Sequence, residues 1–159
     1  GTADAALSWS GDVRLNNQSL TTLPAEDRRV GLIFQDALLF PHMTVGDNLA
    51  FGLAARYRRD RDTAVADALG VAGLEGFGER DPATLSGGQA ARVALMRSLL
   101  AEPDALLMDE AFSALDPERR QAFGGFVREQ VRLRNLPALL VSHDAGDATV
   151  ADGMPVRLA

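Results

Sequence analysis

The amino-acid sequence predicts an α/β fold built on a mainly parallel sheet that helices cover on both faces. Short apolar runs typical of buried strands alternate along the chain with segments whose apolar residues recur at helical spacing. The strong apolar runs end on polar residues, a pattern typical of parallel strands that reach a ligand-binding edge. A length of 159 residues suits one domain.

The first predicted elements are a hairpin and a strand. Residues 7–20 alternate between apolar and polar side chains, and turn signals at 11–12 and 16–17 divide them, so we expect a small antiparallel hairpin. The apolar run 29–35 predicts a strand that ends on the polar residue Gln35.

Two short helices are predicted next. Thr44 fits the cap of a helix over 45–55, in which apolar residues repeat every four positions. The charged stretch 56–62 is interpreted as a solvated connection, and an amphipathic helix around 64–69 follows it. Glycine-rich residues 70–78 then interrupt the helical pattern.

The second half of the chain predicts alternating helices and strands. A helix is expected within 84–100, and an apolar strand over 105–108 follows. The dipeptide Asp116-Pro117 suits the start of a longer helix, because aspartate favours the cap and proline the first helical position. A strong strand over 136–143, a short helix and a weaker strand over 154–159 complete the prediction.

Composition and charge narrow the classes of function. Sixteen basic and twenty-two acidic residues give a net charge of −6, so the chain has no electrostatic reason to bind nucleic acid or anionic lipid. No apolar run approaches the roughly 20 residues that span a bilayer, and we expect an intracellular protein. Every basic residue is arginine and cysteine is absent, which excludes lysine and thiolate chemistry from this chain.

Polar residues at strand ends form the first candidate site. Gln35, Asp109, Glu110 and His143 each follow an apolar strand, and the carboxyl ends of parallel strands share one edge. Asp109 can hold Mg²⁺, Glu110 can polarise an attacking water, and the Gln35 amide can ligate the metal or position water. His143 can donate a hydrogen bond to a terminal phosphate. Each of these residues, taken alone, also fits a purely structural role.

The segment TLSGGQAARVALMRSLL, residues 84–100, is the second candidate site. Gly87 and Gly88 let backbone N–H groups approach an anion, Ser86 adds a hydroxyl, and the following helix directs its positive end to the same point. A serine cap with flexible glycines is the alternative interpretation. Four apolar residues further along this helix are assigned to the core: Val93, Met96, Leu99 and Leu100.

Five segments resemble the motifs of ATP-binding cassette (ABC) ATPases, and their order along the chain is the order in that family. They are the glutamine of GLIFQ (31–35, the Q-loop), LSGGQ (85–89, the signature), ALLMDE (105–110, Walker B), SALD (113–116, the D-loop) and VSHD (141–144, the switch histidine). The resemblance covers nearly the whole chain. Residues 34–53 look especially like the ATPase subunits of bacterial importers.

The resemblance implies a P-loop NTPase-like (RecA-like) fold with its N-terminal part missing. Residues 1–159 would form a single partial ABC ATPase domain, with a helical subdomain at about 42–100 and a core remnant at 1–41 and 101–159. It also implies ATP and Mg²⁺ as cofactors. In the complete protein, Asp109 and Gln35 would bind the metal.

The resemblance further implies an ATP hydrolase that couples hydrolysis to solute transport. Glu110 would be the general base, His143 would sense the γ-phosphate, and Gln35 would link the metal to a membrane permease. Two cassettes would dimerise head to tail, so that Ser86, Gly87, Gly88 and Gln89 complete the ATP site of the opposite subunit. Asp116, in the D-loop, is a further expected nucleotide-binding residue.

The implied partners are a second ABC ATPase subunit and a transmembrane permease, without nucleic acid. The helix at 45–55 and the loop before it would meet the permease's coupling helices. The protein would then be cytoplasmic and peripheral on the inner face of the cell membrane. The transported solute and the direction of transport are not encoded in these motifs.

The sequence departs from the family pattern because the Walker A loop, GxxxxGK[ST], is absent. Gly1 and Thr2 resemble the point just after the helix that follows this loop. We therefore expect this chain alone to be inactive and not to bind ATP normally. The sheet should also have an apolar edge and an uncovered helix-binding face, which favour marginal stability or self-association.

A degenerate, non-hydrolysing cassette that only completes a partner's ATP site is the second interpretation. A native start at Gly1 would favour it, whereas the presence of Glu110 and His143 weighs against it. An ABC-type head from a DNA-repair or chromosome protein is disfavoured, because the sequence has no sustained heptads.

Overall fold

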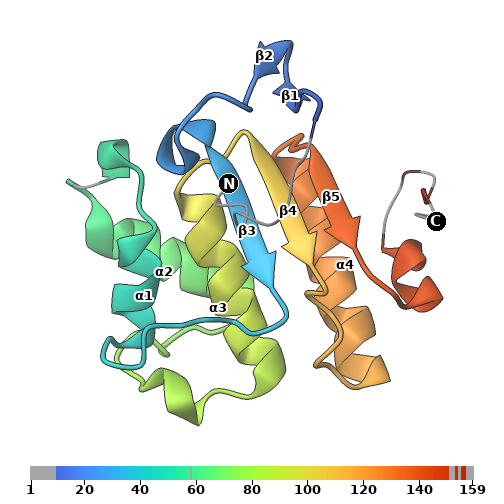
Figure 1. The fold of residues 1–159 in the computed structure, drawn as a ribbon. Coiled ribbons are helices and arrows are strands. Elements are labelled where there is room, and N and C mark those ends of the chain that lie inside the picture. Colours follow the sequence, from blue (N-terminus) through green and yellow to red (C-terminus); the bar gives the residue numbers. More distant parts are fainter. Residues whose placement is uncertain (1–9, 58, 151–152, 154, 157–159) are drawn as a thin grey trace.

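The computed structural model describes residues 10–57, 59–150, 153 and 155–156. Its centre is a three-stranded parallel sheet in the order β3 (Val30–Phe34), β4 (Ala105–Asp109) and β5 (Ala138–Val141). Figure 1 shows the three carboxyl ends at one edge of this sheet. The predicted parallel sheet is confirmed, although β5 is shorter than the strand predicted over 136–143.

A separate antiparallel hairpin precedes the sheet. It pairs β1 (Arg14–Leu15) with β2 (Gln18–Ser19) across Asn16 and Asn17, which have φ values of 49° and 66°. Asparagine tolerates this left-handed region, so the turn follows directly from the Asn-Asn dipeptide. The hairpin prediction is confirmed in this part, and its residues 7–9 lie outside the described residues. A 3₁₀ turn, η1 (Ala25–Arg28), leads into β3.

The described residues form four α-helices, which pack around one core. They are α1 (Val45–Phe51), α2 (Arg61–Ala72), α3 (Gly87–Leu100) and α4 (Pro117–Leu133). Val93 and Leu95 of α3 are fully buried and pack between the other helices and the sheet. Of the predicted core residues on α3, Val93, Met96 and Leu99 are buried, and Leu100 is partly buried.

Helix α1 ends earlier than predicted. The helix stops at Phe51 instead of residue 55, because Gly52 closes the last turn and Ala54 N then donates to Leu100 O at the end of α3. A Cβ on Gly52 would lie 2.1 Å from Arg97 O, so only glycine fits this crossing of α3. The charged connection is also shorter than predicted, because α2 begins at Arg61 after a 3₁₀ turn, η2 (Ala55–Tyr57).

Within the described residues, helices cover only one face of the sheet. Helices α3 and α4 lie behind the strands in Figure 1, and Ile33, Leu106 and Met108 point toward them and are buried. The opposite face carries five apolar side chains that are 38–58% exposed: Leu32, Phe34, Leu107, Leu139 and Val141. The prediction that both faces are covered is therefore wrong for the described part of the chain, whereas the uncovered face expected from the missing Walker A region is found there.

Topology explains this one-sided arrangement. The strand order β3-β4-β5 follows the chain order, and the connections between the strands run through α1 to α3 and then through α4. Parallel strands are joined almost always by right-handed crossovers, so successive crossovers in one direction place their helices on the same face. Helices on the other face would require strands that lie on the far side of the first one.

The C-terminal part is less regular than predicted. The predicted short helix is a 3₁₀ helix, η4 (Ala145–Thr149), and another 3₁₀ turn, η3 (Pro82–Thr84), precedes α3. Of the predicted final strand, Pro155 and Val156 are not in a strand, and the other residues lie outside the described residues. None of the described helices is long and apolar enough to cross a membrane.

Candidate functional site

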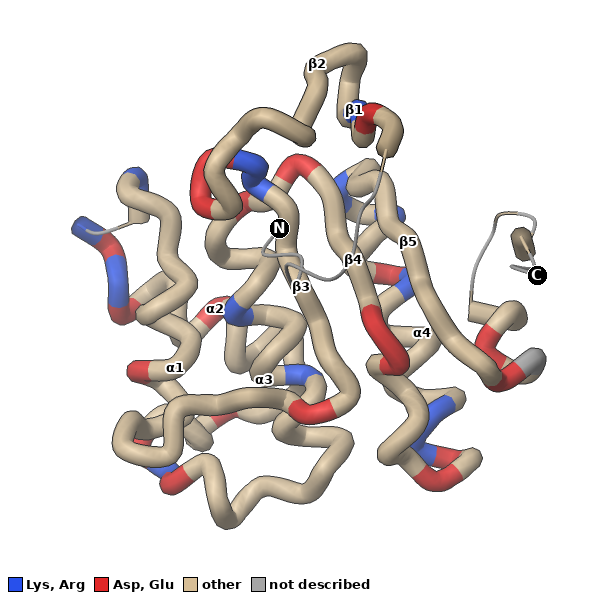
Figure 2. Tube along the Cα trace, viewed as in Figure 1, with Lys and Arg blue, Asp and Glu red and all other residues tan. Residues whose placement is uncertain are grey.

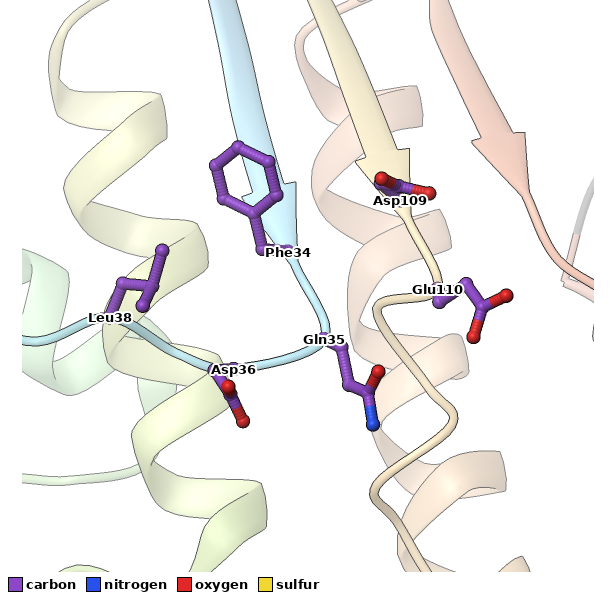
Figure 3. A pocket seen from close by; sticks show the side chains of 6 residues that line it. All are labelled: Phe34, Gln35, Asp36, Leu38, Asp109 and Glu110. Atoms are coloured by element: carbon purple, nitrogen blue, oxygen red, sulfur yellow. The ribbon is translucent and has the colours of Figure 1, made fainter.

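The first candidate site is an open hollow at the carboxyl edge of the sheet, with a volume of about 380 Å³. Figure 3 shows Gln35, Asp109 and Glu110 around it, from the ends of β3 and β4. Phe34 and Asp109 are partners in the parallel register, so Gln35 and Glu110 follow in step on neighbouring strands. The structure therefore brings together three of the four polar strand-end residues that the sequence singled out.

Glu110 is held in an uncommon backbone conformation. Its φ is 49°, in the left-handed region that costs a residue with a Cβ about 1–2 kcal/mol. Three hydrogen bonds hold this turn: Glu110 N donates to Val141 O (2.9 Å), and the amide and hydroxyl of Ser113 donate to Glu110 O (3.0 and 2.8 Å). The turn carries the carboxylate out of β4 toward β5, as Figure 3 shows.

His143 completes the group from the end of β5. Its Nδ1 lies 2.9 Å from Glu110 Oε1, and the ring is exposed. The hydrogen bond to the Glu110 carboxylate raises the pKa of His143 above its ordinary value, and the charge of that carboxylate adds to the shift. In this conformation one carboxylate oxygen of the candidate base, Glu110 Oε1, is engaged in the hydrogen bond with the imidazole.

A polar network behind His143 was missed by sequence reasoning. The Ser142 hydroxyl donates to Asp147 Oδ2 (2.6 Å) and accepts from Asp144 N (3.0 Å), and Asp147 is only 2% exposed. Arg120 of α4 pairs with Asp144, whose pKa is lowered by the Gly146 amide and by Arg120. The network fixes the turn that follows β5. Ser142 and Asp144 belong to the VSHD segment that the sequence singled out, whereas Asp147 and Arg120 gave no sequence signal.

The second candidate site, at the start of α3, forms a complete capping box. Ser86 N donates to Gln89 Oε1 (2.9 Å), and Gln89 N donates to Ser86 Oγ (3.4 Å). The structure thus shows the helix-capping interpretation directly. The capping box does not use the proton of the Ser86 hydroxyl or the backbone N–H groups of Gly87 and Gly88.

The two signature glycines are not needed for packing inside this chain. A Cβ on Gly87 would lie 3.8 Å from Leu115, and one on Gly88 would lie 4.0 Å from Arg119, which are ordinary contacts. Neither residue has a positive φ. These contacts place the signature beside the start of α4, where Asp116 caps the helix by accepting from Arg119 N (3.0 Å).

The structure does not bring this second group into the hollow. The hollow is lined by residues of β3, β4 and the turns after them, and residues 86–89 and Asp116 are not among its lining residues. The sequence-predicted site residues therefore fall into two groups on one chain. One group lies at the sheet edge, and the other lies at the starts of α3 and α4.

Oxygen donors in the hollow fit a magnesium ion that also binds a ligand. The Asp109 carboxylate and the Gln35 amide line it, and Figure 2 shows acidic residues at the ends of β3 and β4. No group of three or more His, Cys, Asp or Glu residues that could hold a metal occurs within the described ranges. Mg²⁺ commonly binds one or two protein oxygens and takes its other ligands from water and phosphate, so this donor set fits.

A groove of about 500 Å³ lies between α1, the loop before it and α3. Phe40 and Phe51 meet edge to face at 4.7 Å, and Arg97 and Ser98 of α3 form the opposite wall. Phe51 is 64% exposed. This is the region that the sequence analysis assigned to a permease contact.

Comparisons with known proteins agree with the motifs. The profile of the family described as "ABC transporter" matches residues 5–113. The uncharacterized ABC transporter ATP-binding protein YnjD of Escherichia coli (strain K12) is 49% identical over 142 residues, which cover 89% of this chain and 65% of YnjD. The sulfate/thiosulfate import ATP-binding protein CysA of Salmonella typhi is 43% identical over 154 residues, covering 92% of this chain and 42% of CysA.

A third relative and a solved structure extend these similarities. The spermidine/putrescine import ATP-binding protein PotA of Oleidesulfovibrio alaskensis is 43% identical over 141 residues, covering 87% of this chain and 38% of PotA. The ATP-binding cassette MJ0796, solved as a dimer in a post-hydrolysis state with ADP and Pi, superposes with a TM-score of 0.74 at 28% identity, covering 90% of this chain and 67% of MJ0796. The chain spans 65% of YnjD and about two-fifths of the importer ATPases.

Proposed function

The chain belongs to the ABC transporter family, and on that premise we propose that it is the ATP-binding, ATP-hydrolysing subunit of a transporter that imports a solute. The observation that carries the proposal is the hollow that joins Gln35, Asp109 and Glu110, with His143 bonded to Glu110. The importer assignment is supported by relatives named as import ATPases for sulfate/thiosulfate and for spermidine/putrescine.

In the proposed reaction, this chain's residues orient water and hold charge. The Glu110 carboxylate accepts a hydrogen bond from the attacking water and orients it, and its Oε2 faces no partner in the described structure besides solvent. His143, released from Glu110, donates to a terminal phosphate oxygen. Mg²⁺, held by Asp109 and Gln35, would neutralise charge that develops on the phosphates.

The signature group would serve the ATP site of a second cassette. Its residues, Ser86, Gly87, Gly88 and Gln89, with Asp116, lie outside this chain's own hollow, as a site divided between two subunits requires. Packing against the described residues does not require these glycines, which favours close approach by something outside the chain. The MJ0796 cassette is dimeric in its solved structure, and we propose a head-to-tail homodimer here.

A transmembrane permease is the other proposed partner. The groove between Phe40, Phe51 and Arg97 offers exposed aromatic surface beside a cation, and it adjoins the loop that follows Gln35. A permease segment seated there would hold the protein at the inner face of the membrane, on the cytoplasmic side. The helical subdomain at about 42–100 and the core at 1–41 and 101–159 remain predictions.

The second candidate function is a degenerate cassette that only completes a partner's ATP site. Lysine and a GxxxxGK[ST] segment are absent from these 159 residues under both candidates, and a coding sequence that starts at Gly1 would favour the degenerate cassette. The Glu110–His143 pair weighs against it, because a module without hydrolysis has no chemical use for a base and a phosphate donor in contact.

Mg-ATP binding and hydrolysis test the two candidates. We would compare this chain with a longer chain that includes the coding sequence upstream in its own gene, and with Glu110→Gln and the matched surface variant Glu118→Gln in each. The first proposal expects the longer chain to bind and hydrolyse ATP. In that chain, Glu110→Gln should abolish hydrolysis while ATP stays bound, and Glu118→Gln should change neither binding nor hydrolysis. If neither chain binds ATP but either stimulates a separate intact cassette, the second function is correct.

A further inference from the structure

Asn48 is a fully buried polar side chain whose hydrogen bonds go to the loop after Gln35 and to Arg97 of α3. Its exposed fraction is 0%. Its Oδ1 accepts from Phe40 N (2.8 Å), and its Nδ2 donates to Phe40 O (3.1 Å) and Thr44 O (2.9 Å). A buried amide that loses such partners costs about 1–3 kcal/mol, so Asn48 fixes the loop firmly to α1.

Arg97 ties the same loop to α3. Its Nη1 donates to Leu38 O (3.0 Å) and Asn48 Oδ1 (3.4 Å), and its Nη2 donates to Ala37 O (3.4 Å). Its guanidinium also lies 5.2 Å from the centre of the Phe40 ring. Burial lowers the pKa of Arg97, and no ion pair to it is found within the described residues. The planar guanidinium group of Arg97 thus binds two successive backbone carbonyls, those of Ala37 and Leu38.

The loop held in this way is itself strained. Leu38 has a φ of 45° and a side chain that is 59% exposed, so no burial of its own favours this conformation. The Leu38 carbonyl is one of the two that Arg97 binds. The conformation only three residues beyond Gln35 therefore depends on hydrogen bonds from α1 and α3.

We propose that Asn48 and Arg97 are positioning residues that make the loop after Gln35 move as one body with α1 and with the signature helix α3. Gln35 then keeps its place beside Asp109 only while α3 keeps its place against the sheet. Arg97 also lines the groove that we assign to a permease, so a segment seated there contacts the clamp directly. The contact between a permease segment and Arg97, and the effect of these residues on catalysis, rest on the proposed function.

Distance measurements between two spin labels test the clamp without nucleotide. The chain has no cysteine, so labels can be placed at Asp36→Cys in the loop and Asp67→Cys on α2, both exposed. We expect a narrow distance distribution that is lost in Arg97→Gln and in Asn48→Ala. The control is Arg92→Gln, which removes another guanidinium of α3 that binds Ala72 O (2.9 Å), far from the loop in sequence.

A second variant and a second label pair keep the test decisive. Arg97→Lys preserves the positive charge but removes the planar guanidinium group. It should broaden the distribution of distances between the labels at positions 36 and 67, even if Arg97→Gln fails to fold. Labels at Asp67→Cys and Glu118→Cys should keep their distribution in all folded variants. The proposal would be overturned if the distances between the labels at positions 36 and 67 were distributed as narrowly in Arg97→Gln or Arg97→Lys as in the control Arg92→Gln.

In an ATP-hydrolysing form, the same variants separate positioning from binding. Misplacement of Gln35 should lower kcat about tenfold or more in Arg97→Gln, with KM for ATP unchanged, whereas Arg92→Gln should alter neither. Equal losses in both arginine variants would refute a positioning role. If the protein hydrolyses no ATP at all, the proposed function fails, and the spin-label result still decides whether the clamp exists.

Discussion

The two faces of the sheet contain the same kinds of side chain in opposite surroundings. On β4, Leu106 is 0% exposed under α3 and α4, whereas its neighbour Leu107 is 38% exposed on the open face. The contrast is repeated on β3, where Ile33 is buried and Phe34 is 44% exposed. Helices of this chain pack against the covered face, whereas no element among the described residues packs against the open face.

This difference shows which features of the chain maintain the fold and which face outward. The outward group includes the open face, the strained turn at Glu110 and the signature glycines, and none of them lies in the buried core of the described residues. Residues that stability does not require are candidates for contacts with something else. The following predictions test the division.

The largest effect is expected for Leu106→Ala. This change removes a fully buried side chain and leaves a cavity, so the free energy of unfolding should fall by about 2–5 kcal/mol. Leu107→Ala, the matched change one residue later, should cost about 1 kcal/mol or less, because water already reaches that side chain. Urea denaturation of both variants measures the difference, and equal losses would mean that both faces are packed in solution.

The open face should control self-association. Leu139 and Val141 lie on β5, which is an edge strand among the described residues, and they are 58% and 50% exposed. An exposed apolar face beside a free strand edge favours pairing with another copy. We expect the chain to associate as its concentration rises, and Leu139→Lys with Val141→Lys to reduce this strongly. Sedimentation velocity would decide, since association that is unchanged in the double variant must use another surface.

The element types could be predicted from the sequence, but several of their ends could not. The Asp116-Pro117 start of α4 and the Ser86 cap of α3 are local signals and are confirmed. The end of α1 depends on the crossing of Gly52 over α3, which is a contact between residues distant in the chain. The alternation of strands and helices wrongly predicted that both faces are covered, because strands that are apolar on both sides do not reveal how far the sheet extends. The missing Walker A region, in contrast, predicted the uncovered face that the described residues show.

The candidate site was predictable only in part for the same reason. The polar strand ends are visible in the sequence because each interrupts an apolar run. The bond between His143 and Glu110, and the support of that turn by Arg120, depend on the β4–β5 register and on α4. Asn48 gave no signal at all, since a single asparagine in a short helix carries no pattern.

A smaller effect, of the opposite sign, is expected at the signature. Gly87→Ala and Gly88→Ala should each raise the free energy of unfolding by about 0.5 kcal/mol, because alanine favours the helix and its Cβ meets only ordinary contacts. In an active dimer the same changes should impair ATP hydrolysis. Thermal denaturation is the direct measurement, and a loss of stability in either variant would show that the glycines do have an internal role.

The smallest effect on stability is expected at the exposed Glu110–His143 pair. The pKa of His143 is raised in the folded chain, so the pairing stabilises the fold below the ordinary histidine value of about 6.5 and is lost as the pH rises through the raised value. Glu110→Gln should therefore lower the pKa of His143. An NMR titration can follow it, since the chain has only two histidines, and an unchanged value would contradict the contact.

The pairing of β3 with β4 also bears on the order of folding. Arg29 and Asp104, which meet at the start of that pairing, are 75 residues apart, whereas Glu110 and His143, which meet at the end of the β4–β5 pairing, are 33 apart. Closing the longer loop loses more chain entropy, and contacts between distant residues slow folding. We therefore expect β4, α4 and β5 to associate first, and the hollow beside Gln35 to be assembled late, when β3 joins the sheet.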